Sequence, residues 1–118
     1  APMLAMLRAL DDRGDARRHL LFYAYRRADR LTGRPAIDAL AQRLALTVVY
    51  VLEEPPPDWP GETGRIRAEL LDRHLPADRR ARAYFVCGPE PMIQATERAL
   101  ASLGVPLRHI HSELFDLV

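Results

Sequence analysis

The sequence predicts an α/β protein, a Rossmann-like doubly wound parallel sheet in a single domain of 118 residues. Apolar, β-prone runs alternate with segments of helical periodicity along the whole chain, which is the element order of parallel strands joined by helical crossovers. The run at 46–53 (LTVVYVLE) is almost continuously apolar, as expected of a strand covered on both faces. With 48% hydrophobic and 28% charged residues, the composition is that of an ordinary globular domain.

The expected elements follow one another in a regular order. Apolar residues at helical spacing, with Pro2 well placed to open a first turn, predict a helix at the start of the chain. Three further helices and four strands are expected. The helices lie at residues 35–44, 62–75 and 91–104, and the strands at 19–26, 46–53, 82–87 and 107–114. The Pro-rich stretch 54–61 (EPPPDWPG) is expected to be a loop.

Charge and composition exclude several classes of function. The net charge is +1, and the 17 basic residues, all arginine, alternate with 16 acidic ones, so no basic surface for nucleic acid is expected. No apolar run approaches the roughly 20 residues that cross a bilayer, and one cysteine makes no internal disulfide. His109 and His111 lack a third ligand at suitable spacing, so no metal site is predicted. We expect a cytoplasmic protein, or the cytoplasmic domain of a membrane protein.

The junction at 87–91 (CGPEP) is the first candidate site. In doubly wound sheets, ligands bind beyond the carboxyl ends of the strands, where the chain turns into the next helix. Gly88 lets a ligand approach the main chain, Pro89 stiffens the turn, and the start of the following helix offers N–H groups to a negatively charged group. The residues alone leave an alternative open, in which Cys87 is a small buried hydrophobe and Gly-Pro merely ends a strand.

The stretch 84–92 (YFVCGPEPM) resembles the C-G-P-x-x-M signature of the ferredoxin–NADP reductase superfamily, in its pyridine-nucleotide domain. Other segments resemble further motifs of that family in the same order: residues 1–3 (APM), 23–26 (YAYR), 59–66 (WPGETGRI) and 112–115 (SELF). The resemblance covers essentially the whole chain, and five ordered motifs are more specific than any single one. The ending 110–115 (IHSELF) is most similar to ferric-reductase-like or oxygenase-reductase members of bacterial type.

The resemblance implies roles for the residues of these motifs. Cys87 would contact the nicotinamide and help align its hydride with a flavin, without acting as a nucleophile, while Gly88 and Pro89 give the cofactor room. Glu113 would lie near the flavin edge and Phe115 against its face; the alternatives are a solvated glutamate and a core phenylalanine. Three more residues are placed beside the cofactor loops: Pro2, Met3 and Met92.

The adenosine half of the cofactor is expected at another strand end. Arg26 and Arg27 follow the strand at 19–26, where the resemblance places the 2′-substituent of the adenine ribose. A guanidinium there suits a 2′-phosphate, and no Asp or Glu stands at that strand end, so NADPH is favoured over NADH. Gly64 and Arg65 would approach from the neighbouring loop. Solvated arginines, and a glycine that only shapes a helix start, are the alternatives.

The resemblance also implies an N-terminally truncated domain. The family's first strand and glycine-rich loop would precede residue 1, and that strand would be central, between those at 19–26 and 82–87. Residues 1–118 would then be the NAD(P)-binding domain, the C-terminal part of a larger flavin reductase with an FAD-binding barrel upstream. Without these parts we expect the chain to be catalytically inactive and to lack a stable, high-affinity nucleotide site.

The predicted function is therefore that of the parent protein, an NAD(P)H-dependent flavin oxidoreductase. It would pass hydride from NAD(P)H to FAD and electrons onward to a ferredoxin or other iron–sulfur centre, a haem domain or a ferric chelate. A noncatalytic nucleotide-sensing or regulatory module of the same fold is the alternative. A receiver-like signalling domain needs a phosphoacceptor Asp at a strand end, whereas the expected strands end in Arg26, Glu53 and Cys87.

Overall fold

The computed structural model describes residues 2–114, and the chain divides into two compact units, Ala1–Arg65 and Ile66–Val118. All paired strands in the described part are parallel. The prediction of an α/β fold with a parallel sheet is thereby confirmed. Within residues 2–114 the strands form two sheets, in the orders β1-β2-β3 and β4-β5. Strand β1 pairs only with β2, and β4 only with β5, so one edge of each is without a partner strand among these residues.

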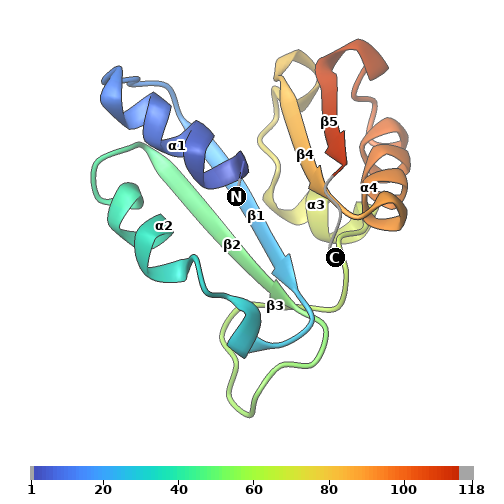
Figure 1. Ribbon diagram of the computed structural model, residues 1–118. Helices are drawn as coiled ribbons and strands as arrows, with labels where there is room; N and C mark the ends of the chain where they lie inside the picture. The colour runs from blue at the N-terminus through green and yellow to red at the C-terminus, as the bar shows by residue number, and fades with distance from the viewer. Residues whose placement is uncertain (1, 115–118) are drawn as a thin grey trace. The chain divides into compact units, whose positions relative to one another are not determined.

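The described part of the first unit contains two helices and three strands (Figure 1). A short 3-10 turn (η1, Ala28–Arg30) lies between its first strand and its second helix. Its helices are α1 (Pro2–Asp12) and α2 (Arg34–Ala41), and its strands are β1 (His19–Tyr25), β2 (Leu46–Leu52) and β3 (Glu62–Thr63). Both helices lie along one face of the β1–β2 pair (Figure 1). They bury a shared apolar core with the strands, made of Leu7, Leu21, Ile37, Leu40, Leu44 and Leu46.

Within its described residues, 66–114, the second unit has a two-stranded parallel sheet and two helices. The helices are α3 (Ala68–His74) and α4 (Glu90–Ser102), the strands are β4 (Tyr84–Gly88) and β5 (Ile110–Leu114), and 3-10 turns η2 (Arg79–Ala81) and η3 (Leu107–His109) precede the strands. Helix α4 packs on the sheet and on α3 (Figure 1). Its buried residues recur at the three- and four-residue intervals of one helix face: Ile93, Thr96, Ala99 and Leu100.

The predicted helix at 62–75 is wrong over its first six residues. Glu62 and Thr63 instead form β3, paired with Val51 and Leu52, and the helix begins only at Ala68. Gly64 explains the break, because its φ of 96° lies in the left-handed region that a helix excludes. The other boundaries agree with the prediction more closely, although the first three residues expected in the last strand form the turn η3.

Arg79 ties the end of α3 to the start of β4. Its guanidinium donates hydrogen bonds to the main-chain oxygens of Asp72 (3.3 Å), Leu75 (3.1 Å) and Pro76 (3.3 Å). A helix end leaves carbonyl groups of this kind without partners. The same guanidinium contacts the Asp72 carboxylate at 2.5 Å, and the Tyr84 hydroxyl donates to the Arg79 carbonyl at 2.7 Å. With only 18% of its side chain exposed, Arg79 is part of the structure rather than a solvated charge.

Replacing this arginine therefore tests the packing of the second unit. We expect Arg79→Ala to lower the free energy of unfolding by roughly 1–3 kcal/mol, because hydrogen bonds from a charged donor are lost and helix carbonyls lose their partner. Arg43→Ala is the control: Arg43 is 59% exposed and its ion pair with Asp11 should contribute less than about 1 kcal/mol. Chemical denaturation of the full-length protein measures both, and equal losses would contradict this role of Arg79.

Candidate functional site

The carboxyl ends of β1, β2 and β3 meet at one edge of the first unit. The parallel register places Tyr25 opposite Leu52, so Arg26 and Arg27 come beside Glu53 and Glu54. Main-chain hydrogen bonds continue past the strands, from Glu53 N to the Tyr25 oxygen (3.1 Å) and from Glu54 N to the Arg26 oxygen (2.7 Å). The backbone itself therefore brings two arginines and two glutamates together.

The third strand adds Gly64 and Arg65 to the same edge. The Gly64 N–H donates to the Leu52 oxygen at 2.8 Å, which holds the chain against the end of β2. Arg65 then forms an ion pair with Glu53, and the hydrogen bond and negative charge of that carboxylate raise the pKa of the guanidinium. The predicted pair Gly64 and Arg65 thus lies at the same sheet edge as the predicted pair Arg26 and Arg27, with the end of β2 between them.

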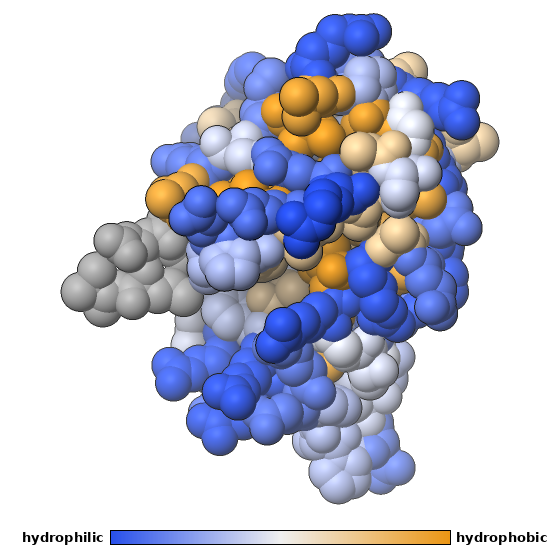
Figure 2. Space-filling model, turned by 90° about the vertical axis from the view of Figure 1, so that its right-hand side faces the viewer, coloured by the Kyte–Doolittle hydropathy of each residue, from blue (hydrophilic) through white to orange (hydrophobic). Residues whose placement is uncertain are grey.

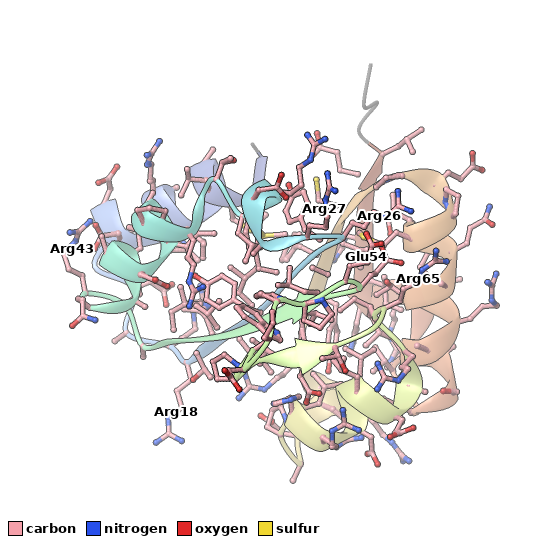
Figure 3. The ribbon with its side chains drawn as sticks, turned by 90° about the horizontal axis from the view of Figure 1, so that it is seen from below. Arg18, Arg26, Arg27, Arg43, Glu54 and Arg65 are labelled. Carbon is pink, nitrogen blue, oxygen red and sulfur yellow. The ribbon has the colours of Figure 1, made fainter. Side chains whose placement is uncertain are left out.

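Each of the three arginines at this edge has an acidic partner. Arg26 Nε lies 3.1 Å from Glu54 Oε2, Arg27 Nε lies 3.6 Å from Asp29 Oδ1, and Arg65 pairs with Glu53. Figure 3 shows Arg26, Arg27, Glu54 and Arg65 gathered where the strands end, whereas Arg18 and Arg43 lie toward the strands' beginnings. The edge therefore combines guanidinium groups, which suit phosphate, with carboxylates, which suit hydroxyl groups.

Aromatic packing fixes the loop that joins β2 to β3. The Trp59 indole N–H donates to the Glu62 oxygen at 3.0 Å. The Arg34 guanidinium lies over the rings of Tyr50 and Trp59, at 4.5 and 5.6 Å from their centroids. A Cβ on Gly61 would come within 2.8 Å of the Trp59 ring, so a glycine is needed for this close approach. These contacts hold the loop that begins at the strand-end glutamates.

The second unit presents its own strand end at Cys87, Gly88 and Pro89. Strand β4 ends at Gly88, Pro89 stands at the N-cap with an extended backbone, and α4 begins at Glu90. The parallel register places Cys87 opposite Glu113 and Gly88 opposite Leu114. The predicted strand-to-helix junction is thereby present, and Glu113 lies beside the thiol.

The Met92 side chain covers Gly88. A Cβ added to Gly88 would lie 2.2 Å from Met92 Cε and 3.0 Å from its Sδ, so no larger residue fits while the methionine keeps this position. Because Met92 is the flexible member of the pair, it would have to move. Met92 can therefore take this position only because Gly88 has no side chain.

One face of the β4–β5 sheet carries an exposed aromatic residue. Phe85 is 52% exposed and stacks on His111, with ring centroids 5.1 Å apart and planes inclined by 25°. Strand alternation puts Cys87 and Glu113 on the same face as this pair, whereas Ser112, on the other face, hydrogen-bonds Glu97 of α4. On the side of the molecule shown in Figure 2, hydrophobic groups appear in separate spots among hydrophilic ones.

The Cys87 thiol is kept protonated by its surroundings. Burial raises its pKa above the ordinary value, and the negative charge of Glu113 raises it further. Cysteine nucleophiles instead sit in electropositive settings that lower their pKa.

Three further residues were predicted to border the cofactors: Pro2, Met3 and Phe115. Pro2 begins α1, and Met3 packs partly buried against the core of the first unit. Phe115 lies outside the described residues. Sequence reasoning missed Glu53 and Glu54 as site residues; the signal available was two consecutive acids directly after the apolar run at 46–52, next to a strand that ends in two arginines.

Within residues 2–114, no cluster of three His, Cys, Asp or Glu side chains is suited to a metal ion. No helix of that part is long and apolar enough to cross a membrane. Parallel strands whose carboxyl ends carry a glycine-containing turn and phosphate-compatible arginines define a class of protein, the nucleotide-binding α/β domains.

Comparison with known proteins agrees with that class and narrows it. Residues 1–98 match the family model of the oxidoreductase NAD-binding domain. The chain belongs to this family. NADH-cytochrome b5 reductase 1 of Neosartorya fischeri is 32% identical over 124 residues, covering 99% of this chain and 40% of that protein. The stachydrine N-demethylase reductase subunit Stc4 of Rhizobium meliloti is 32% identical over 117 residues, covering 97% and 33%.

Solved structures give the same result. The cytochrome b5 reductase domain of Ulva prolifera nitrate reductase has a TM-score of 0.83 at 25% identity, covering 95% of this chain and 44% of that one. The Amycolatopsis cytochrome P450 reductase GcoB also has a TM-score of 0.83, at 26% identity, covering 98% and 34%. The chain thus spans less than half the length of these relatives. None of them supports a noncatalytic sensor.

The protonated state of Cys87 leads to a direct chemical test. In the full-length protein we expect iodoacetamide to alkylate Cys87 more slowly at neutral pH than an unhindered thiol, with the rate rising only as pH exceeds the ordinary thiol pKa. Peptide mass spectrometry after timed quenching measures this. Glu113→Gln removes one cause of the raised pKa and should shift the rate profile to lower pH. A profile that does not move would show that Glu113 has no electrostatic effect on the thiol.

Proposed function

We propose that residues 1–118 are the NAD(P)H-binding part of a flavin-dependent oxidoreductase. The observation that carries the proposal is the strand-to-helix junction of β4 and α4, where Cys87 lies opposite Glu113, Met92 covers Gly88, and Pro89 precedes the helix. Membership in the oxidoreductase NAD-binding domain family supports the same reading. Because the relatives are more than twice as long as the matched region, the rest of the reductase is assigned to other parts of a longer protein.

The nicotinamide end of the dinucleotide is assigned to the second unit. Gly88 is buried beneath Met92, so the methionine has to move aside for a ligand to reach the main chain there, while Pro89 stiffens the turn and Cys87 provides a small uncharged surface for the ring. Glu113, beside the thiol, orders the strand end and is an acceptor for polar hydrogens of the substrate. Phe115 is proposed to cover the flavin. Positioning is the main contribution of these residues, because holding two reactants in register accelerates transfer without further chemistry from the protein.

The adenosine and pyrophosphate end is assigned to the strand ends of the first unit. Arg26, Arg27 and Arg65 provide positive charge and hydrogen-bond donors, and Gly64 lets the ligand approach the chain after β3. Pro2 and Met3 are proposed to border the pyrophosphate from the start of α1. FAD, held by another part of the longer protein, supplies the hydride-accepting chemistry.

Onward electron transfer is proposed to an iron–sulfur, haem or ferric acceptor. The named relatives include a cytochrome b5 reductase, a reductase domain of nitrate reductase and a cytochrome P450 reductase. The cytochromes named for these relatives, cytochrome b5 and cytochrome P450, are haem proteins, which supports a haem acceptor. A cytoplasmic location is part of the proposal, since flavin reductases of this kind draw on the cellular NAD(P)H pool.

Anaerobic stopped-flow mixing of the full-length protein with NADH or NADPH tests this function. The wild type should lose its oxidised-flavin absorbance on mixing. We expect Gly88→Ala to slow this reduction by about tenfold or more, because the new methyl group displaces Met92 and a misplacement of about 1 Å can cost on the order of 100-fold.

Gly14→Ala is the control, since Gly14 lies in the turn after α1, at the other end of β1; alanine there strains a φ of 65°, but its Cβ meets no atom within 4 Å. It should reduce flavin at the wild-type rate. A wild-type protein that reacts with neither nucleotide, or a Gly88→Ala variant as fast as the control, would contradict the proposal.

A further inference from the structure

The charge balance at the first unit's strand ends points to a residue that selects the nucleotide. We propose that Glu54, through its ion pair with Arg26, makes this protein prefer NADH, and that removing the carboxylate uncovers a site for the 2′-phosphate of NADPH. The inference rests on the proposed function and names a specificity determinant within it.

The pair is built from neighbouring strands rather than from one stretch of chain. Arg26 follows β1 and Glu54 follows β2, and the hydrogen bond from Glu54 N to the Arg26 oxygen (2.7 Å) holds the two residues side by side. Their side chains then meet at 3.1 Å, between Arg26 Nε and Glu54 Oε2 (Figure 3). No acid stands directly at the end of β1 in the sequence, but Glu54 after β2 brings one there in space.

The two nucleotides differ at this position by a single group. NADPH carries a phosphate on the adenine ribose, with a charge near −2 at neutral pH, where NADH carries a hydroxyl. Arginine binds such a phosphate best when two of its N–H groups can donate parallel hydrogen bonds to the phosphate oxygens. With Arg26 Nε engaged by Glu54, that fork is partly occupied and its charge is neutralised. A phosphate arriving there would also meet the carboxylate, which repels it but accepts a hydrogen bond from a hydroxyl.

The neighbouring charges reinforce this effect. Glu53 pairs with Arg65, and Asp29 lies 3.6 Å from Arg27. Each of these three pairs balances one positive charge with one negative charge, so together they offer little net attraction to an additional dianion. Glu54 is distinguished from the other two acids because its partner, Arg26, directly follows β1, the strand end at which ribose recognition is expected.

The pair is also easy to change without loss of the fold. The Arg26 and Glu54 side chains are 74% and 56% exposed, and ion pairs this exposed contribute little to stability. A substitution here therefore reports on ligand selection rather than on unfolding.

The experiment compares NADPH with NADH in the full-length protein, using kcat/KM for reduction of an artificial electron acceptor. We expect Glu54→Gln to raise the NADPH-to-NADH ratio by about tenfold, the change that one unit charge a few ångströms away produces in a partly hydrated site. The double variant Arg26→Gln with Glu54→Gln should return the ratio toward the wild-type value, because the gain requires the uncovered guanidinium.

Glu69→Gln is the control, since Glu69 is an exposed glutamate of α3 in an ion pair with Arg73 at 2.9 Å, and its ratio should not change. An unchanged ratio in Glu54→Gln, or an equal loss with both nucleotides, would overturn the inference while leaving the proposed function intact. Failure of the wild type to oxidise either nucleotide would instead overturn the proposed function and this inference with it.

Discussion

Parallel strand pairing in register is the constraint on which the rest of the structure depends. Seven residue pairs from His19↔Leu46 to Tyr25↔Leu52 align β1 with β2, and five from Tyr84↔Ile110 to Gly88↔Leu114 align β4 with β5. Because parallel strands end at the same edge, the residues that follow them are brought together whatever their distance in sequence. A slip of one residue would turn every side chain of a strand to the opposite face and separate these groups.

The residues that hold the fold differ in kind from those that form the site. Leu52, Leu70 and Val51 are fully buried and contribute through apolar burial, which is the dominant stabilising term in folding. The strand-end arginines and glutamates are exposed, so their ion pairs add little stability. Their charges are instead available to a ligand, and exchanging one of them can alter specificity while the core remains the same.

The fold was largely predictable from the sequence because its signals are local. The β-branched run defines β2, and Gly104, with a φ of 87°, ends α4 as glycine commonly does. The start of α3 was not predictable in this way, since helical spacing continues through Ile66 while Gly64 and pairing with β2 hold the chain extended. The contact between Glu54 and Arg26 was missed for a similar reason. That contact can be inferred only when the β1–β2 register is known, whereas the Cys87 junction is formed by consecutive residues of the sequence.

Hydrogen–deuterium exchange of the full-length protein, with and without saturating nucleotide, tests the central claim most directly, namely that the strand ends of both units bind the dinucleotide. The account predicts slower exchange in peptides that contain residues 26–27, 53–54, 64–65 and 87–90. Peptides at the opposite ends of the strands, around Arg18 and Arg43, should exchange as before. Protection confined to those opposite ends, or none in residues 1–118, would contradict the account.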